Sequence, residues 1–237
     1  LFNEDFGEYR LLPEDLRAAL MAGDPPWDGI DAVFISHYHD DHFSPADVID
    51  YLRAQAGVRL FAPEQAAAAL RAVAGEDPTL LERVTAVRLE YGDPPRRFEL
   101  PGLVIDAVRI PHSGWPSQLT DVENLAWCIT LDDGPTVLHL GDADTKVAHY
   151  TKDAQFWQQR TLHLALPPYW YFLSVNGLAV LKEQLRPDHT VGIHMPVTVP
   201  QTPDEREEAL RQVDLFTKPG ETRTIPHEHT EPAAGLN

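Results

Sequence analysis

The fold of this chain is decided by the stretch Ala32-Val33-Phe34-Ile35-Ser36-His37-Tyr38-His39-Asp40-Asp41-His42. Its first four residues are apolar, which is typical of a buried strand. Its last six residues hold three histidines and the carboxylate of Asp41 in the spacing H-x-H-x-D-H. Imidazole nitrogen and carboxylate oxygen are ligands that zinc and related divalent ions prefer, and a strand end holds them in place. The pattern therefore predicts a metal site, in preference to a polar turn that happens to be rich in histidine.

Length and charge limit the possible classes of protein. The chain has 237 residues, of which 43% are apolar, so we expect one domain over 1–237 with one sizeable core. The formal net charge of −18 argues against a nucleic-acid partner, because binding phosphate backbones requires a positive patch. A small anionic substrate stays compatible with this charge, since a bound metal pair is locally cationic.

The single cysteine, Cys128, lies in an apolar segment and is interpreted as a buried structural thiol rather than a ligand or nucleophile. One cysteine forms no disulfide within the chain, so cysteine usage leaves the compartment open. The sequence contains no apolar run of membrane-spanning length and no signal peptide. We expect a soluble protein, cytoplasmic by default, although the start at Leu1 rather than methionine is compatible with a missing leader. Oligomeric state is left open.

Helix and strand signals alternate along most of the chain. Hydrophobic periodicity and capping residues predict helices over 13–22, 45–57, 63–74, 172–185 and 203–216. Besides the strand before the histidine loop, strands are expected over 58–62, 85–89, 97–100, 103–110, 125–131, 136–140, 161–166 and 189–194. The four strands between 97 and 140 predict a meander, and we expect helices to cover the sheets on both sides.

Three further ligand candidates each stand at the end of a predicted strand, namely His112, Asp142 and His194. Strand ends at one edge of a sheet converge, so these side chains are expected to join the histidine loop. Simpler interpretations are a loop histidine for His112 and a turn aspartate for Asp142. His189 competes with His194 for the last position.

Taken together, the H-x-H-x-D-H loop, His112, the Gly141-Asp142 step and His194 resemble the metallo-β-lactamase superfamily in residue order. The resemblance runs across most of the chain. A looser resemblance, based on general spacing, is to the branch of L-ascorbate-6-phosphate lactonase-like and N-acyl-phosphatidylethanolamine phospholipase D-like hydrolases.

The resemblance implies an α/β (α+β) fold, a four-layer αβ/βα sandwich that binds two divalent metals, zinc before manganese or iron. It assigns the first metal to His37, His39 and His112, the second to Asp41, His42 and His194, and Asp142 to both. Histidine at position 39 differs from the glutamate of flavodiiron relatives. Aspartate at position 142 differs from the cysteine of zinc β-lactamases.

One departure from the family concerns the start of the chain. Members usually have a longer hairpin region before the histidine loop than the thirty-six residues found here. The domain is therefore expected to be N-terminally incomplete and to lack the first strands of the sandwich.

The implied reaction is hydrolysis of an ester, lactone or phosphodiester by a hydroxide that bridges the metals. Asp41 is expected to orient this nucleophile, and His139 to fix a ligand or donate to an oxyanion, unless it is a core histidine. Trp115, Tyr169 and Trp170 are either core anchors or the wall of a pocket for a small-molecule or lipid-like substrate. The alternatives are a nuclease of the same superfamily and a metal-binding protein that keeps the fold without catalysis.

Overall fold

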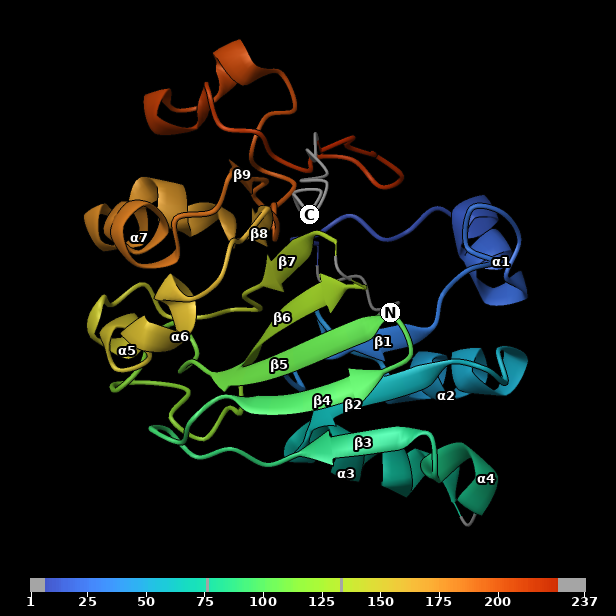
Figure 1. Ribbon diagram of the computed structural model, residues 1–237. Helices are drawn as coiled ribbons and strands as arrows, with labels where there is room; N and C mark the ends of the chain where they lie inside the picture. The colour runs from blue at the N-terminus through green and yellow to red at the C-terminus, as the bar shows by residue number, and fades with distance from the viewer. Residues whose placement is uncertain (1–6, 76, 133, 226–237) are drawn as a thin grey trace, which may run out of the picture.

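The computed structural model describes residues 7–75, 77–132 and 134–225, which form two β-sheets with helices outside them (Figure 1). The first sheet is parallel, in the order β1-β2-β3, with β1 Ala32–Phe34, β2 Arg59–Pro63 and β3 Val84–Val87. The second has six strands in sequence order, namely β4 Arg96–Leu100, β5 Leu103–Arg109, β6 Leu125–Leu131, β7 Thr136–His139, β8 Leu164–Leu166 and β9 His189–Thr190. Its first four strands are antiparallel, which confirms the predicted meander, and β8 and β9 join in parallel.

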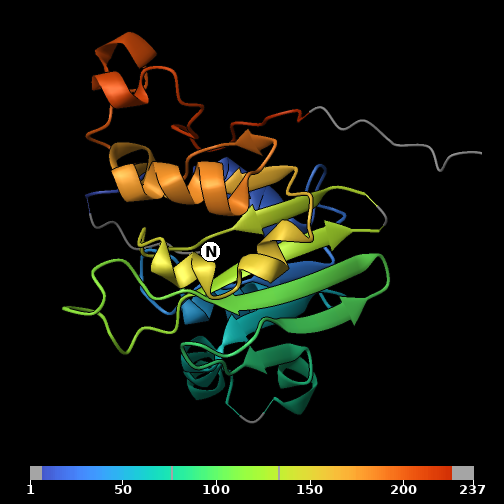
Figure 2. The ribbon, with the colours of Figure 1, turned by 60° about the vertical axis from the view of Figure 1, so that its left-hand side comes forward.

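The helices form the two outer layers. The α-helices are α1 Glu14–Ala22, α2 Pro45–Ala54, α3 Glu64–Ala74, α4 Pro78–Leu81, α5 Ala148–Thr151, α6 Ala154–Gln158 and α7 Val175–Ala179. The blue and teal helices α1 to α4 accompany the three-stranded sheet, whereas α5 to α7 cover the outer face of the six-stranded sheet (Figure 2). In the part of the chain that the structure describes, no helix has the length and hydropathy needed to span a membrane.

Alternation along the strands explains the layers. In β2, Leu60 packs against the helices, whereas its neighbour Phe61 faces the other sheet. In β5, Ile105 faces the first sheet and Val108 faces α5 to α7. Successive strand residues point to opposite faces, so each sheet buries both faces and three apolar layers result. The predicted four-layer sandwich is confirmed; a single domain over 1–237 stays a prediction.

The signals at helix ends explain why α1 begins and stops close to its predicted bounds and why α2 begins at Pro45, although α2 ends at Ala54 and not at the predicted Gly57. Gly23 ends α1 in a left-handed conformation with φ of 71°. The Ser44 side chain accepts a hydrogen bond from the Asp47 backbone N–H at 3.3 Å, and Pro45 occupies the first helical position of α2. The histidine loop is thereby held between the end of β1 and a capped helix.

The helix predicted over 203–216 is wrong. This segment contains only two short 3₁₀ turns, Pro203–Glu205 and Glu208–Leu210. The Arg206 side chain is buried and donates to the carbonyls of Pro200, Gln201 and Val213. These bonds satisfy backbone acceptors in a loop conformation, which removes the advantage of a helix.

Two other boundaries differ from the prediction. The segment 172–185 divides into a 3₁₀ turn over Tyr169–Leu173, then α7 after the cap Ser174, then a π-helical Val180–Leu185. The strand predicted over 189–194 is regular only for His189–Thr190 and continues as single bridges at Gly192 and Ile193.

Candidate metal centre

The histidine loop is a tight turn between β1 and α2. His37 is fully buried directly after β1. The carbonyl of His39 accepts hydrogen bonds from the backbone N–H groups of His42 at 2.9 Å and Phe43 at 3.0 Å. The Phe43 side chain is buried beneath the helix layer, which anchors the turn. A strand end and an apolar anchor therefore fix the loop at both ends.

The loops after β5 and β7 bring the next two residues beside this turn. The Ser113 N–H donates to the carbonyl of Asp142 at 2.7 Å, and His112 forms a β-bridge with Ala143. His194 follows β9 with φ of 61°, a left-handed conformation that is uncommon for a residue with a side chain. The loops after these strands therefore converge, as expected.

All seven predicted ligands belong to three groups, and within each group the ligand atoms lie within 4.8 Å of one another. The groups are His37, His39 and His112; His37, His42 and Asp142; and Asp41, His42 and His194. Asp142 lies between the first and last groups. Its Oδ1 is 3.2 Å from His42 Nε2, and its Oδ2 is 3.5 Å from His112 Nε2 and 3.4 Å from His194 Nε2.

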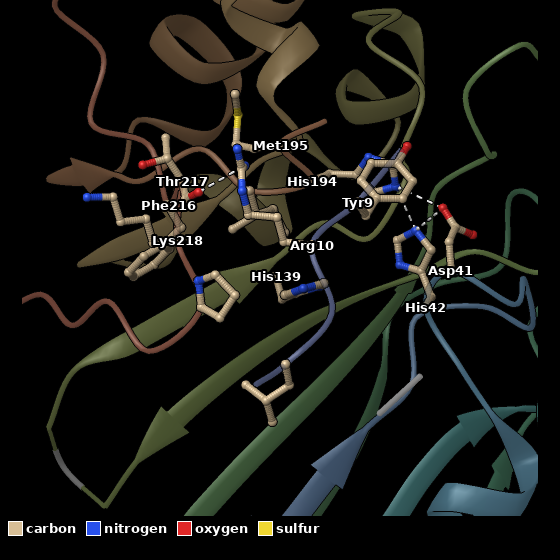
Figure 3. Close-up of a pocket in the computed structure, with 13 residues that line it drawn as sticks. Tyr9, Arg10, Asp41, His42, His139, His194, Met195, Phe216, Thr217 and Lys218 are labelled. Atoms are coloured by element: carbon tan, nitrogen blue, oxygen red, sulfur yellow. Dashed lines mark hydrogen bonds and ion pairs between the residues drawn. The ribbon is translucent and has the colours of Figure 1, made fainter. Parts of the chain in front are cut away.

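The third group faces a cavity, as Figure 3 shows. His194 Nε2 lies 2.9 Å from His42 Nε2 and 3.3 Å from Asp41 Oδ2. Two imidazole nitrogens and a carboxylate oxygen thus point at one small region. This is the donor set and the convergence that a divalent ion needs.

The hydrogen bonds of the cluster test whether metal ions fit there. Among the described residues, His37 Nε2, His112 Nε2 and Asp142 Oδ1 are buried without a hydrogen-bond partner. His112 Nδ1 donates to the carbonyl of Ser113 at 2.8 Å, so the lone pair of its neutral ring is on Nε2. Buried polar atoms without partners are costly, and a cation within the cluster would satisfy them. The residues present fit divalent metal ions.

The local electrostatics favour the ligand forms of these side chains. Burial and the neighbouring imidazoles lower the pKa of His37 well below its usual value, and burial also lowers the pKa of His39. Both rings are therefore neutral near pH 7, as metal ligation requires. Burial raises the pKa of Asp142, but the neighbouring imidazoles of His112, His42 and His194 more than offset this and hold the pKa well below its usual value, so the group is a carboxylate.

Asn124 ties the ligand-bearing loops together, and sequence reasoning missed it. Its side chain is fully buried and donates to the carbonyls of Ile110 and Leu140 at 3.2 Å each. Its Oδ1 accepts the backbone N–H of Asp142 at 2.9 Å. A side chain on Gly141 would meet that oxygen at 2.4 Å, so this position requires glycine. An isolated asparagine before a strand gave no signal of this role.

His139 ends β7 and lines the cavity that contains Asp41, His42 and His194. Its Nδ1 accepts the backbone N–H of Gly141 at 3.0 Å. Burial, followed by the charge of His42, lowers the pKa of His139 to about 4. The ring is therefore neutral with its proton on Nε2, and it can act as a hydrogen-bond donor.

The three aromatic residues predicted to wall a substrate pocket occupy different surroundings. The ring of Trp170 packs 5.1 Å from that of His194, and Tyr169 is its neighbour at 5.7 Å. Trp115 packs instead against Tyr91 at 5.3 Å and His149 at 5.2 Å. None of the three lines the cavity at the metal centre, so their substrate-binding role stays a prediction.

The cavity has a volume of about 430 Å³, within the size range of small-molecule sites. Its walls include residues from both ends of the chain that were not predicted, among them Tyr9, Arg10, Phe216 and Lys218. Tyr9 packs its ring 4.6 Å from that of His194. No local pattern in the sequence connects these two segments.

Comparisons with known proteins concern the family and the fold of the chain. A family model described as a β-lactamase superfamily domain matches residues 14–195. A search of curated proteins found no match.

Solved structures show a similar fold. A predicted metal-dependent hydrolase from Parabacteroides distasonis has a TM-score of 0.51 and 16% identity over 78% of this chain and 74% of its own. A diphosphatase of the PhnP family has a TM-score of 0.50 and 18% identity over 92% of this chain and 79% of its own. A variant of the β-hydroxylase CmlA has a TM-score of 0.50 and 15% identity over 69% of this chain and 36% of its own. At these identities the likeness concerns the fold alone.

Proposed function

The chain belongs to the metallo-β-lactamase superfamily, and we propose that it is a hydrolase that uses two divalent metal ions on an ester, lactone or phosphodiester. The observation that carries this proposal is the position of Asp142. Its carboxylate lies 3.5 Å from His112 Nε2, which belongs to one group of imidazoles, and 3.2 and 3.4 Å from His42 Nε2 and His194 Nε2, which belong to the other. A carboxylate placed between two sets of imidazoles suits a ligand shared by two ions.

The residues divide into two proposed ligand sets. His37, His39 and His112 hold one ion, and Asp41, His42 and His194 hold the other. Nitrogen and oxygen donors with no thiolate suit zinc first, and manganese or iron next.

The remaining groups have proposed roles in the reaction. When bound, the metal ions supply a water of lowered pKa and positive charge for the developing oxyanion. Asp41 reaches the cavity with a half-exposed carboxylate, which orients the attacking water and accepts its proton. His139 donates a hydrogen bond from Nε2 to the oxygen that gains charge in the transition state.

Metal content and hydrolysis, measured together, test the proposal. The chain is loaded with zinc or manganese, its metal content is determined, and aryl esters, lactones and aryl phosphodiesters are screened. We expect two ions per chain and hydrolysis of at least one class. Replacing the shared ligand, in Asp142→Ala, should abolish hydrolysis and remove both ions.

Histidine variants supply the matched control. His189 lies five residues before His194 and outside every ligand group among the described residues. His194→Ala should lose one ion and hydrolysis, while His189→Ala should keep both. One ion or none in the loaded wild-type protein would refute the two-metal proposal. Tight binding of single-stranded RNA at physiological salt would favour the nuclease alternative.

A further inference from the structure

The cavity at the metal centre contains a pair of cations. Arg10 and Lys218 both line it, and its one lining carboxylate among the described residues is Asp41, a proposed ligand. The chain as a whole carries 37 acidic and 19 basic residues. Two cations gathered in the cavity of so acidic a chain are an unusual charge distribution.

Neither cation is neutralised by a carboxylate in the part of the chain that the structure describes. Arg10 Nη1 donates to the carbonyl of Thr217 at 3.2 Å, which leaves the other donors of the guanidinium available. Lys218 makes no side-chain hydrogen bond or ion pair with a described residue. The bond to Thr217 joins segments 207 residues apart in sequence and thereby brings the two charges to one cavity.

Lys218 lies across the cavity from the ligand cluster, and Arg10 lies between them. In Figure 3, Lys218 and Thr217 lie on one side, Asp41, His42 and His194 on the other, and Arg10 and His139 between them. The lining of the cavity also includes apolar side chains, among them Leu12 and Phe216. A short apolar segment of a ligand would therefore fit between the scissile bond and a charged end.

We propose that Arg10 and Lys218 together bind a permanent anionic group of the substrate, a carboxylate or a phosphate, on the Lys218 side of the cavity. The substrate class is then a small anionic ester whose scissile bond is separated from its charge by a short apolar segment. This proposal rests on the proposed function. Guanidinium and ammonium groups recognise such anions by charge-assisted hydrogen bonds.

A pair of esters with one leaving group tests the charge preference. The zinc-loaded full chain is given mono-4-nitrophenyl adipate, which is anionic, and 4-nitrophenyl hexanoate, which is neutral, and spontaneous rates are subtracted. Wild type should have a kcat/KM about tenfold or more higher for the anionic ester, as expected for a charge-assisted contact. Arg10→Gln and Lys218→Gln should each reduce this ratio several-fold, mainly through KM.

Matched controls separate this effect from a general loss of charge. Arg211 also donates to one backbone carbonyl, that of Arg206, and Lys182 is also exposed, but neither lines the cavity. Arg211→Gln and Lys182→Gln should keep the wild-type ratio. A ratio near one in wild type, or an equal ratio in wild type and the cavity variants, would overturn the proposal while leaving the hydrolase intact.

A binding measurement decides the proposal if neither ester is turned over, an outcome that counts against ester hydrolysis itself. Adipate is titrated calorimetrically into the zinc-loaded wild type and the same four variants. Affinity should fall about tenfold in Arg10→Gln and in Lys218→Gln, and stay unchanged in the two controls. Equal affinities in all five proteins would show that adipate binds without these cations and would overturn the proposal. Phosphate, titrated in the same way, distinguishes the two kinds of anion.

Discussion

At the scale of single residues, the second ring nitrogen decides what each histidine can do. His112 Nδ1 donates to a carbonyl, so its Nε2 is free to bind a metal ion. His139 Nδ1 accepts a backbone N–H, so its Nε2 keeps the proton. The same kind of side chain is thus suited to metal binding in one place and to hydrogen-bond donation in another. The sequence contains both histidines but not their partners, so His139 was predicted only as one of two alternatives.

Replacing His139 by asparagine tests the roles of its two ring nitrogens separately. The Asn Oδ1 can accept the Gly141 N–H as His139 Nδ1 does, but the proposed Nε2–H donor to the oxyanion is lost. We expect kcat to fall about a hundredfold with both ions retained, because removing one oxyanion donor has this size of effect. Steady-state kinetics and metal analysis of the variant, beside His189→Asn, check it. An unchanged kcat would remove His139 from the reaction.

Cys128 gives a pH prediction far from the metal ligands. Burial raises the pKa of this thiol to about 12, whereas in the unfolded chain it is about 8.5. Above pH 8.5 the unfolded state releases a proton that the folded state keeps, so stability falls as pH rises toward 12. Between pH 7.5 and 9.5 this thiol should lower the free energy of unfolding by about 1 kcal/mol.

Urea unfolding of wild type and Cys128→Ala at both pH values measures this difference. When the pH is raised from 7.5 to 9.5, the free energy of unfolding should fall by about 1 kcal/mol less in the variant than in wild type. The thiol should also resist alkylation in the folded protein and react in urea. Rapid alkylation at pH 8 without denaturant would contradict its burial.

At the scale of elements, strands with strict alternation were predictable and irregular segments were not. β5 and β6 match the expected 103–110 and 125–131 closely because both of their faces are buried. The segment 203–216 has a helical pattern of residues, but the buried Arg206 side chain donates to the carbonyls of Pro200, Gln201 and Val213 and holds the segment in a loop conformation. Such tertiary contacts override local propensity. Asn124, which connects three loops, illustrates the same limit.

Asn124→Leu removes three buried hydrogen bonds while keeping the volume of the side chain. The Asp142 N–H and the carbonyls of Ile110 and Leu140 are then left without this partner. We expect unfolding free energy to fall by about 2–4 kcal/mol and metal affinity to fall at least tenfold. Chemical denaturation and metal titration measure the two effects, with the exposed Asn176→Leu as control. Wild-type metal affinity in Asn124→Leu would show that the loops hold the ligands without it.

At the scale of the whole molecule, the convergence of the seven ligand candidates was predictable because each of them lies in a loop that follows a strand in sequence. The sandwich then needs only to bring the strand ends to one edge. The cavity was not predictable, because its cations come from segments that meet through the contact between Arg10 and Thr217, 207 residues apart. Motifs in a sequence reflect neighbours along the chain, whereas the walls of a cavity depend on long-range contacts.

The seven proposed ligands are expected to hold two metal ions that share Asp142. X-ray diffraction from crystals of the zinc-loaded protein, recorded at the zinc absorption edge, tests it most directly. We predict two anomalous peaks about 3.5–4 Å apart, one beside His37, His39 and His112 and the other beside Asp41, His42 and His194. A single peak, or two peaks without Asp142 between them, would contradict the account.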